Sequence, residues 1–144
     1  MQLKLLFSKW TQVAALLLIG GAVAWTIKLG VIIATNGRII DTGAAALFMK
    51  VGLLLLLIGS TGIGNQLSLN RTLMLRIAAI IFSPVVAAGL FLLFAMITKP
   101  LLNPLLNNSG VWYAQQEAPI ALAVVFFLSM GCLLYRSYKP LASN

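Results

Sequence analysis

The stretch that decides the fold is residues 43–64, GAAALFMKVGLLLLLIGSTGIG, in which Lys50 is the only charged residue. A transmembrane helix needs about 20 mostly apolar residues, and this stretch supplies them without a proline. Three other stretches of the chain have the same apolar character. The sequence therefore predicts four transmembrane spans, at about residues 11–34, 43–64, 72–98 and 118–135.

The composition of the whole chain agrees with this interpretation. Of its 144 residues, 61% are hydrophobic and 8% are charged, and the mean hydropathy is +1.04. A soluble domain is about a quarter charged, so a soluble enzyme, a soluble binding module and a disordered tail are excluded. We expect residues 1–144 to form one all-α integral membrane domain, an antiparallel four-helix transmembrane bundle with up-down-up-down topology and short loops.

The basic residues indicate how such a bundle is oriented. The formal net charge is +8, and the basic residues lie scattered near the ends of the predicted spans. They form no stripe, so membrane topology explains them better than a nucleic-acid partner, and none is expected. If both termini lie in the cytoplasm, the basic residues in the connections on the outer side are only Arg38 and Lys99. The basic residues on the inner side are then Lys4, Lys9, Arg71, Arg76, Arg136 and Lys139. This bias predicts a multi-pass protein of the cell inner (cytoplasmic) membrane with both termini in the cytoplasm.

Lys28 and Lys50 are the first candidates for a function, since an ionisable side chain at membrane depth costs several kcal/mol unless it is paired or hydrated. Each lies ~12–13 Å from the outer turn between the first two spans at 1.5 Å per residue. Asp41 and Glu117, the only acids in the chain, belong to the same outer side. We expect an outer polar pocket of Lys28, Lys50, Asp41 and Glu117 that holds an anion, a lipid headgroup or water. The alternative is that each lysine snorkels to the interface along its own stem.

Small residues spaced four apart indicate close packing between helices. The helix-packing candidates are Gly20, Ala24, Ser60, Gly64 and Ala87. They serve either the packing of one bundle or an interface with a second copy or a partner subunit. Ser83 and Pro84 form a candidate hinge, because Pro84 cannot donate a hydrogen bond to the carbonyl of Ile80 and a kink is expected there.

The connections between spans carry two further expectations. The segment Asp41-Thr42-Gly43 is expected to cap the second helix, because the carboxylate of Asp41 accepts hydrogen bonds from the free N–H groups of a first turn. Residues 99–117 contain Pro-Leu-Leu-Asn twice and are expected to be the longest connection. Their leucines, together with Trp112 and Tyr113, favour a segment that lies on the membrane surface.

The sequence offers almost no material for catalysis. It has no histidine and a single cysteine, Cys132, so no catalytic residue, no metal and no cofactor is expected. The leading hypothesis is a small non-enzymatic polytopic membrane protein that acts through helix–helix contacts, as an accessory or assembly subunit or as a homo-oligomer. The alternative is a small-solute or ion transporter, or an oligomeric pore, that uses an outward-facing polar pocket with Lys28 and Lys50. The expected partners are the lipid bilayer and either a second copy or a larger membrane complex.

Overall fold

The computed structural model describes residues 2–137, with side chains described from residue 9 onward. This part of the chain forms four helices and no strand: α1 (Gln2–Ala34), α2 (Gly43–Leu67), α3 (Leu73–Asn108) and α4 (Ala114–Ser137). All four are long and apolar enough to cross a membrane. The predicted all-α fold with four such helices is therefore confirmed. The side chains of Lys4 and Lys139, which entered the topology prediction, lie outside the described residues.

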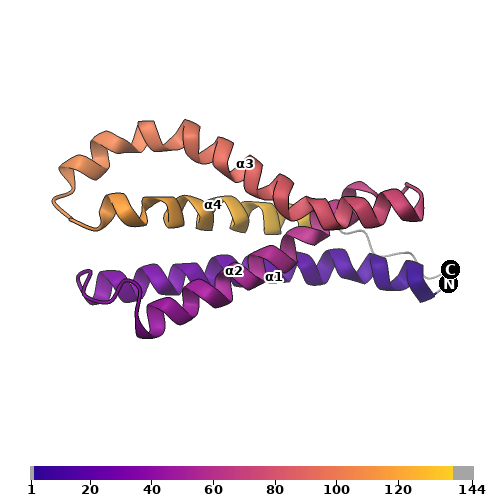
Figure 1. The fold of residues 1–144 in the computed structure, drawn as a ribbon, viewed down its shortest axis with the longest axis horizontal. Helices are drawn as coiled ribbons and strands as arrows, with labels where there is room; N and C mark the ends of the chain where they lie inside the picture. Colours follow the sequence, from indigo (N-terminus) through magenta and orange to yellow (C-terminus); the bar gives the residue numbers. More distant parts are fainter. Residues whose placement is uncertain (1, 138–144) are drawn as a thin grey trace.

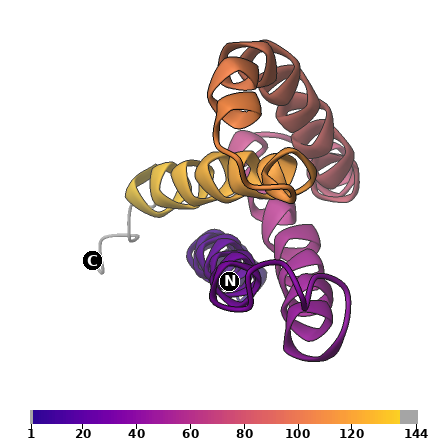
Figure 2. The ribbon, with the colours of Figure 1, turned by 90° about the vertical axis from the view of Figure 1, so that its left-hand side faces the viewer.

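Each helix packs beside the next one along the chain, and α4 also packs against α1. In Figure 1, α1 and α3 run from right to left, whereas α2 and α4 run from left to right. In the end-on view of Figure 2, α1 and α3 lie on opposite sides of α2 and α4. The core therefore lies where α1 meets α2 and α4.

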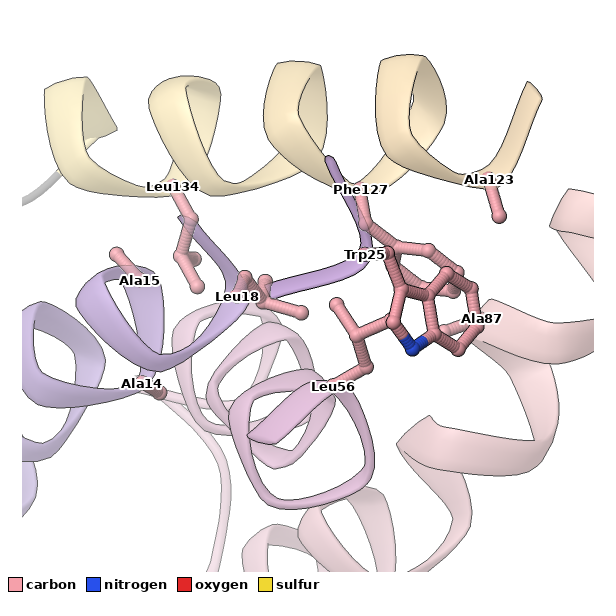
Figure 3. Packing of buried hydrophobic residues seen from close by; sticks show 9 residues of the cluster. All are labelled: Ala14, Ala15, Leu18, Trp25, Leu56, Ala87, Ala123, Phe127 and Leu134. Carbon is pink, nitrogen blue, oxygen red and sulfur yellow. The ribbon is translucent and has the colours of Figure 1, made fainter. Parts of the chain in front are cut away.

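Small and large side chains alternate in this core. Its buried members come from all four helices: Ala14, Ala15, Leu18, Trp25, Leu56, Ala87, Ala123, Phe127 and Leu134. Figure 3 shows the ring of Trp25 lying between Phe127 of α4 and Leu56 of α2. The indole N–H of Trp25 donates a hydrogen bond of 3.1 Å to the carbonyl of Met49, so this aromatic residue joins α1 and α2 by both packing and hydrogen bonding.

The glycines of α2 allow two neighbouring helices to approach its backbone. A Cβ at Gly59 would lie 2.9 Å from the carbonyl oxygen of Ala14 in α1, and a Cβ at Gly64 would overlap the carbonyl oxygen of Ala79 in α3. Close approach of this kind increases van der Waals contact, which drives helix association where lipid offers no hydrophobic gain. Absence of a side chain at Gly59 and Gly64 is thus what lets α2 lie between α1 and α3.

The small residues singled out in the sequence lie within the packing of this one chain. Ala24, Ser60, Gly64 and Ala87 are buried, and Gly20 is half-buried beside Leu55. Ser60 and Gly64 lie on α2, and the carbonyl oxygen of Ser60 accepts a 2.9 Å hydrogen bond from the hydroxyl of Ser83 on α3. These positions therefore serve the contacts among the four helices of the chain.

The hydroxyl of Ser83 also lies beside the carbonyl that the following proline leaves without a donor, and its single proton is shared between that oxygen and the carbonyl oxygen of Ser60. Pro84 leaves the carbonyl of Ile80 without its usual N–H donor, and the hydroxyl of Ser83 lies 3.0 Å from that oxygen. The α3 helix continues through Pro84 without a break, and Figure 1 shows it as a bowed helix. The role of Ser83 and Pro84 as a hinge stays a prediction.

The prediction that residues 99–117 form a long connection is wrong for most of that segment. Helix α3 continues through Pro100 and Pro104 to Asn108, and α4 begins at Ala114. The fixed φ of a proline is compatible with a helix. Proline destabilises the helix through one lost hydrogen bond and local crowding. Here Pro100 and Pro104 lie within α3 and do not end it. Only residues 109–113 connect the two helices, with Gly110 at φ +68°.

The expected cap of the second helix also differs from the structure. The N-cap position of α2 is Thr42, which makes no side-chain capping hydrogen bond. Asp41 is exposed and lies one residue too early to reach the first turn as an N-cap side chain does. The backbone N–H of Ala46 instead bonds to the carbonyl of Thr42 at 3.5 Å, so the first turn of α2 is closed by its own backbone.

A substitution at Gly64 tests the close approach of α2 and α3. Gly64→Ala places a Cβ against the carbonyl oxygen of Ala79, so the helices must separate, and overpacking of this kind costs about 1–3 kcal/mol. We expect a lower unfolding midpoint in detergent micelles. Gly89 on α3 is the matched control, because a Cβ there would meet no atom within 4 Å, and Gly89→Ala should keep or slightly raise the midpoint. A Gly64→Ala variant as stable as the parent would contradict the packing described here.

Candidate functional site

Lys28 of α1 and Glu117 of α4 form a buried ion pair. The Nζ atom of Lys28 lies 3.2 Å from Oε2 of Glu117, and the two side chains are 3% and 7% exposed. Glu117 lies in the first turn of α4, where the helix dipole favours a negative charge. Each residue supplies the opposite charge that the other needs in a water-poor environment. The pair therefore ties α1 to α4.

Two turns of the chain meet beside this pair. The α1–α2 turn contains Gly37 at φ +75°, and its N–H donates a 2.8 Å hydrogen bond to the carbonyl of Ile32 at the end of α1. A Cβ at Gly37 would come within 2.7 Å of the Trp112 ring and would also meet Tyr113. Trp112 and Tyr113 belong to the α3–α4 turn, and their rings make an edge-on contact with centroids 5.7 Å apart. Glycine is thus required at position 37 both for its backbone conformation and for this contact.

The structure brings together two of the four residues expected in the outer pocket. Lys28 and Glu117 are paired, whereas Lys50 and Asp41 are exposed. Among the side chains that the structure describes, Lys28 and Glu117 make the ion pair, and neither Lys50 nor Asp41 joins it. The expected pocket is therefore a closed pair with two separate exposed residues. Its function as a binding site stays a prediction.

Depth along a helix did not determine which lysine faces the bundle. Lys28 lies four residues after Ala24, on the buried face of α1. Lys50 lies two residues before Gly52, which packs against Trp25. Two residues correspond to about 200° around a helix, so Lys50 lies on the far side of α2 from α1. This rotation about the axis of α2, together with the contact of Gly52 with Trp25, separates the two lysines.

A second polar cluster, which sequence reasoning missed, joins α1, α2 and α3. The guanidinium of Arg76 donates from Nε and Nη2 to Oδ1 of Asn65, at 3.0 and 2.8 Å. Asn65 in turn donates from Nδ2 to the hydroxyl oxygen of Thr11 at 2.9 Å. All three residues are buried, and their polar atoms satisfy one another as burial requires. The sequence signal that could have indicated this cluster is the presence of polar residues near the ends of three neighbouring apolar stretches.

The side chains of the described residues make a buried ion pair and a set of hydrogen bonds between helices. Those residues contain no group of three or more His, Cys, Asp or Glu side chains that could hold a metal ion. Cys132 is exposed on α4. The ammonium and carboxylate of the buried pair hold two helices together, and together they contribute no net charge to the interior of the bundle.

Comparison of the chain with protein-family models, with curated proteins and with solved structures gives no match in any of the three. The function is therefore inferred from the residues and contacts of this chain.

The ion pair predicts a characteristic pattern of stabilities. Lys28→Gln or Glu117→Gln leaves the other charge buried without its partner, which costs roughly 3–5 kcal/mol. The double variant Lys28→Met/Glu117→Met replaces the pair by apolar side chains of similar volume, so we expect stability close to that of the parent. Unfolding in detergent measures all three.

Lys50→Gln is the matched control for this series, because Lys50 is an exposed lysine on the neighbouring helix. We expect it to change the unfolding midpoint little. A double methionine variant as unstable as the two glutamine variants combined would contradict the ion pair.

Proposed function

We propose that this chain is a multi-pass protein of the cell inner (cytoplasmic) membrane, in which α1–α4 form an antiparallel bundle with up-down-up-down topology. Four apolar helices of sufficient length support this placement. Helix α3 gives further support, since only 11% of its most apolar window is buried inside the chain. Large apolar surfaces of this kind suit contact with lipid chains.

The proposed orientation follows the positive-inside rule. The cytoplasmic side contains the α2–α3 turn, which includes Arg71, and the first turn of α3, which includes Arg76. Residue 2 of α1 and residue 137 of α4 lie on the same side. Arg38 and Lys99 lie on the outer side. The Lys28–Glu117 pair is then in the outer half of the bundle, and the Thr11–Asn65–Arg76 cluster is in the inner half.

Within the membrane, we infer that the protein acts without catalysis, through helix–helix contacts. It serves as an accessory or assembly subunit of a larger membrane complex or as a homo-oligomer. The observation that carries this inference is the enclosure of the Lys28–Glu117 pair, because its charges satisfy each other and link α1 to α4. A carrier needs polar groups that a solute can reach, whereas a fixed pair suits a bundle that keeps its shape while neighbours contact its outer surface.

The transporter alternative now has a more specific form. The pair lies beside two turns that meet at Gly37 and Tyr113, and separation of these turns would give access to it from the outer side. A pathway of this kind would use Lys28 and Glu117. Lys50 would take no part in it, since this residue lies on the α2 face directed away from α1.

Native mass measurement of the detergent-extracted protein tests the subunit proposal. We expect either a complex that contains another membrane protein or a multiple of the 15.4 kDa chain. A monomer at every mild detergent condition would contradict association. Solute flux in liposomes that Lys28→Met/Glu117→Met abolishes would favour the transporter, because that double variant keeps the fold but removes the charges.

A further inference from the structure

An apolar crevice follows the junction of α2 and α3. One cavity of about 620 Å³ is lined by Trp10, Thr61 and Val85, with other apolar residues of α2 and α3. A second cavity of about 110 Å³ continues past Leu57 and Pro84, which line both. The two helices lie side by side near the α2–α3 turn and diverge toward their other ends (Figures 1 and 2). The larger cavity lies nearer that turn, and the smaller one lies farther from it.

The polar groups in the crevice wall already have hydrogen-bond partners. The hydroxyl of Thr61 donates to the carbonyl of Ile58 and accepts from the indole N–H of Trp10 at 3.1 Å. The carbonyl of Ser60 accepts from the hydroxyl of Ser83. The wall thus offers mainly hydrocarbon to an occupant, which suits an acyl chain and disfavours a polar solute.

Lys50 stands at the outer end of this crevice. Leu53, Leu57 and Thr61 follow it at spacings of three, seven and eleven residues, so the four residues form one stripe along α2. Lys50 is exposed and lies about one turn, ~4.5 Å, beyond Leu53 in the crevice wall. Within the described part of the chain no acid pairs with it, because Glu117 pairs with Lys28.

Eleven residues from Lys50 to Thr61 span ~16 Å, which is comparable to the ~15 Å of an acyl chain that fills half of the hydrocarbon core. Lys50 lies seven residues, ~10 Å, inside the start of α2, so its ammonium reaches a headgroup by extending outward along its own stem. An ammonium at the end of an apolar stripe attracts the phosphate of a lipid headgroup. We propose that the α2–α3 crevice binds one acyl chain of an anionic phospholipid of the outer leaflet, with the lipid phosphate at Lys50. This inference rests on the proposed membrane placement.

Tryptophan fluorescence tests the proposal, because Trp10 and Trp25 both line the crevice. The chain has three tryptophans, so Trp112→Phe leaves only those two. The variant is reconstituted in phosphatidylcholine vesicles with a minor, equal fraction of bromine-labelled phosphatidylglycerol or bromine-labelled phosphatidylcholine. We expect stronger quenching by the brominated phosphatidylglycerol. This excess of quenching by phosphatidylglycerol over phosphatidylcholine should disappear in Lys50→Gln and remain in Lys50→Arg.

Two matched controls separate the headgroup contact from the chain contact. Lys99→Gln removes another exposed lysine of the outer half, which lies eleven residues beyond Ala88 in the crevice wall. We expect this variant to keep the stronger quenching by the brominated phosphatidylglycerol. Ala88→Phe fills the crevice and should lower quenching by both brominated lipids. Ala121→Phe adds the same side chain at an exposed site on α4. We expect this variant to leave quenching by both brominated lipids unchanged.

The outcomes that overturn the proposal are distinct. Equal quenching by the two headgroups, or an excess that persists in Lys50→Gln, means that Lys50 does not select an anionic lipid. An oligomer that shields Trp10 and Trp25 from both lipids means that a second copy occupies the crevice. Failure of the protein to float with the vesicles would instead contradict the membrane placement itself.

Discussion

A lysine that is buried between apolar helices needs an opposite charge beside it, and this requirement determines how α1 and α4 are joined. The effective cost of removing each ion from water is several kcal/mol, which is recovered only with good geometry and a close partner. Glu117 meets the requirement at 3.2 Å from Lys28. Because the chain has only two acids, few other arrangements could bury Lys28. The pair therefore constrains which helix can lie against the Lys28 face of α1.

Polar contacts link α1 to its neighbours at both ends, and small residues bring it close to them in between. The cluster of Thr11, Asn65 and Arg76 links α1, α2 and α3, as the ion pair links α1 and α4 at the opposite end. Between these clusters, Gly59 of α2 admits the α1 backbone. With their polar groups satisfied internally, the helices present apolar side chains outward, as a bilayer requires. The proposed roles in subunit contact and in lipid binding both use this outer surface.

The apolar stretches predicted the number and type of helices because a long apolar run allows few other structures. Lys28 follows Ala24 by four residues, and both lie on the buried face of α1. Glu117 was expected near it because both belong to the outer side. The structure brings Glu117 to 3.2 Å from Lys28, whereas the role of this pair in an outer binding pocket stays a prediction.

Other features depend on information that local sequence does not carry. Lys50 was grouped with Lys28 by depth, although rotation around α2 places it on another face. Residues 99–117 were expected to connect the third and fourth spans, yet α3 continues through Pro100 and Pro104 to Asn108. The contact of Arg76 with Asn65 depends on how α2 and α3 pack after a turn, and the sequence pattern gives no distance for it.

Cysteine accessibility tests the proposed fourfold crossing most directly. Cys132→Ser removes the only native thiol, and single cysteines are then placed at Ile39, Asn70 and Asn108, which are all exposed. A membrane-impermeant maleimide is added to spheroplasts before and after permeabilisation. Four crossings with residues 2 and 137 both on the cytoplasmic side predict labelling at positions 39 and 108 from outside, and at position 70 only after permeabilisation. Labelling of position 70 in sealed spheroplasts, or protection of position 39, would contradict this topology.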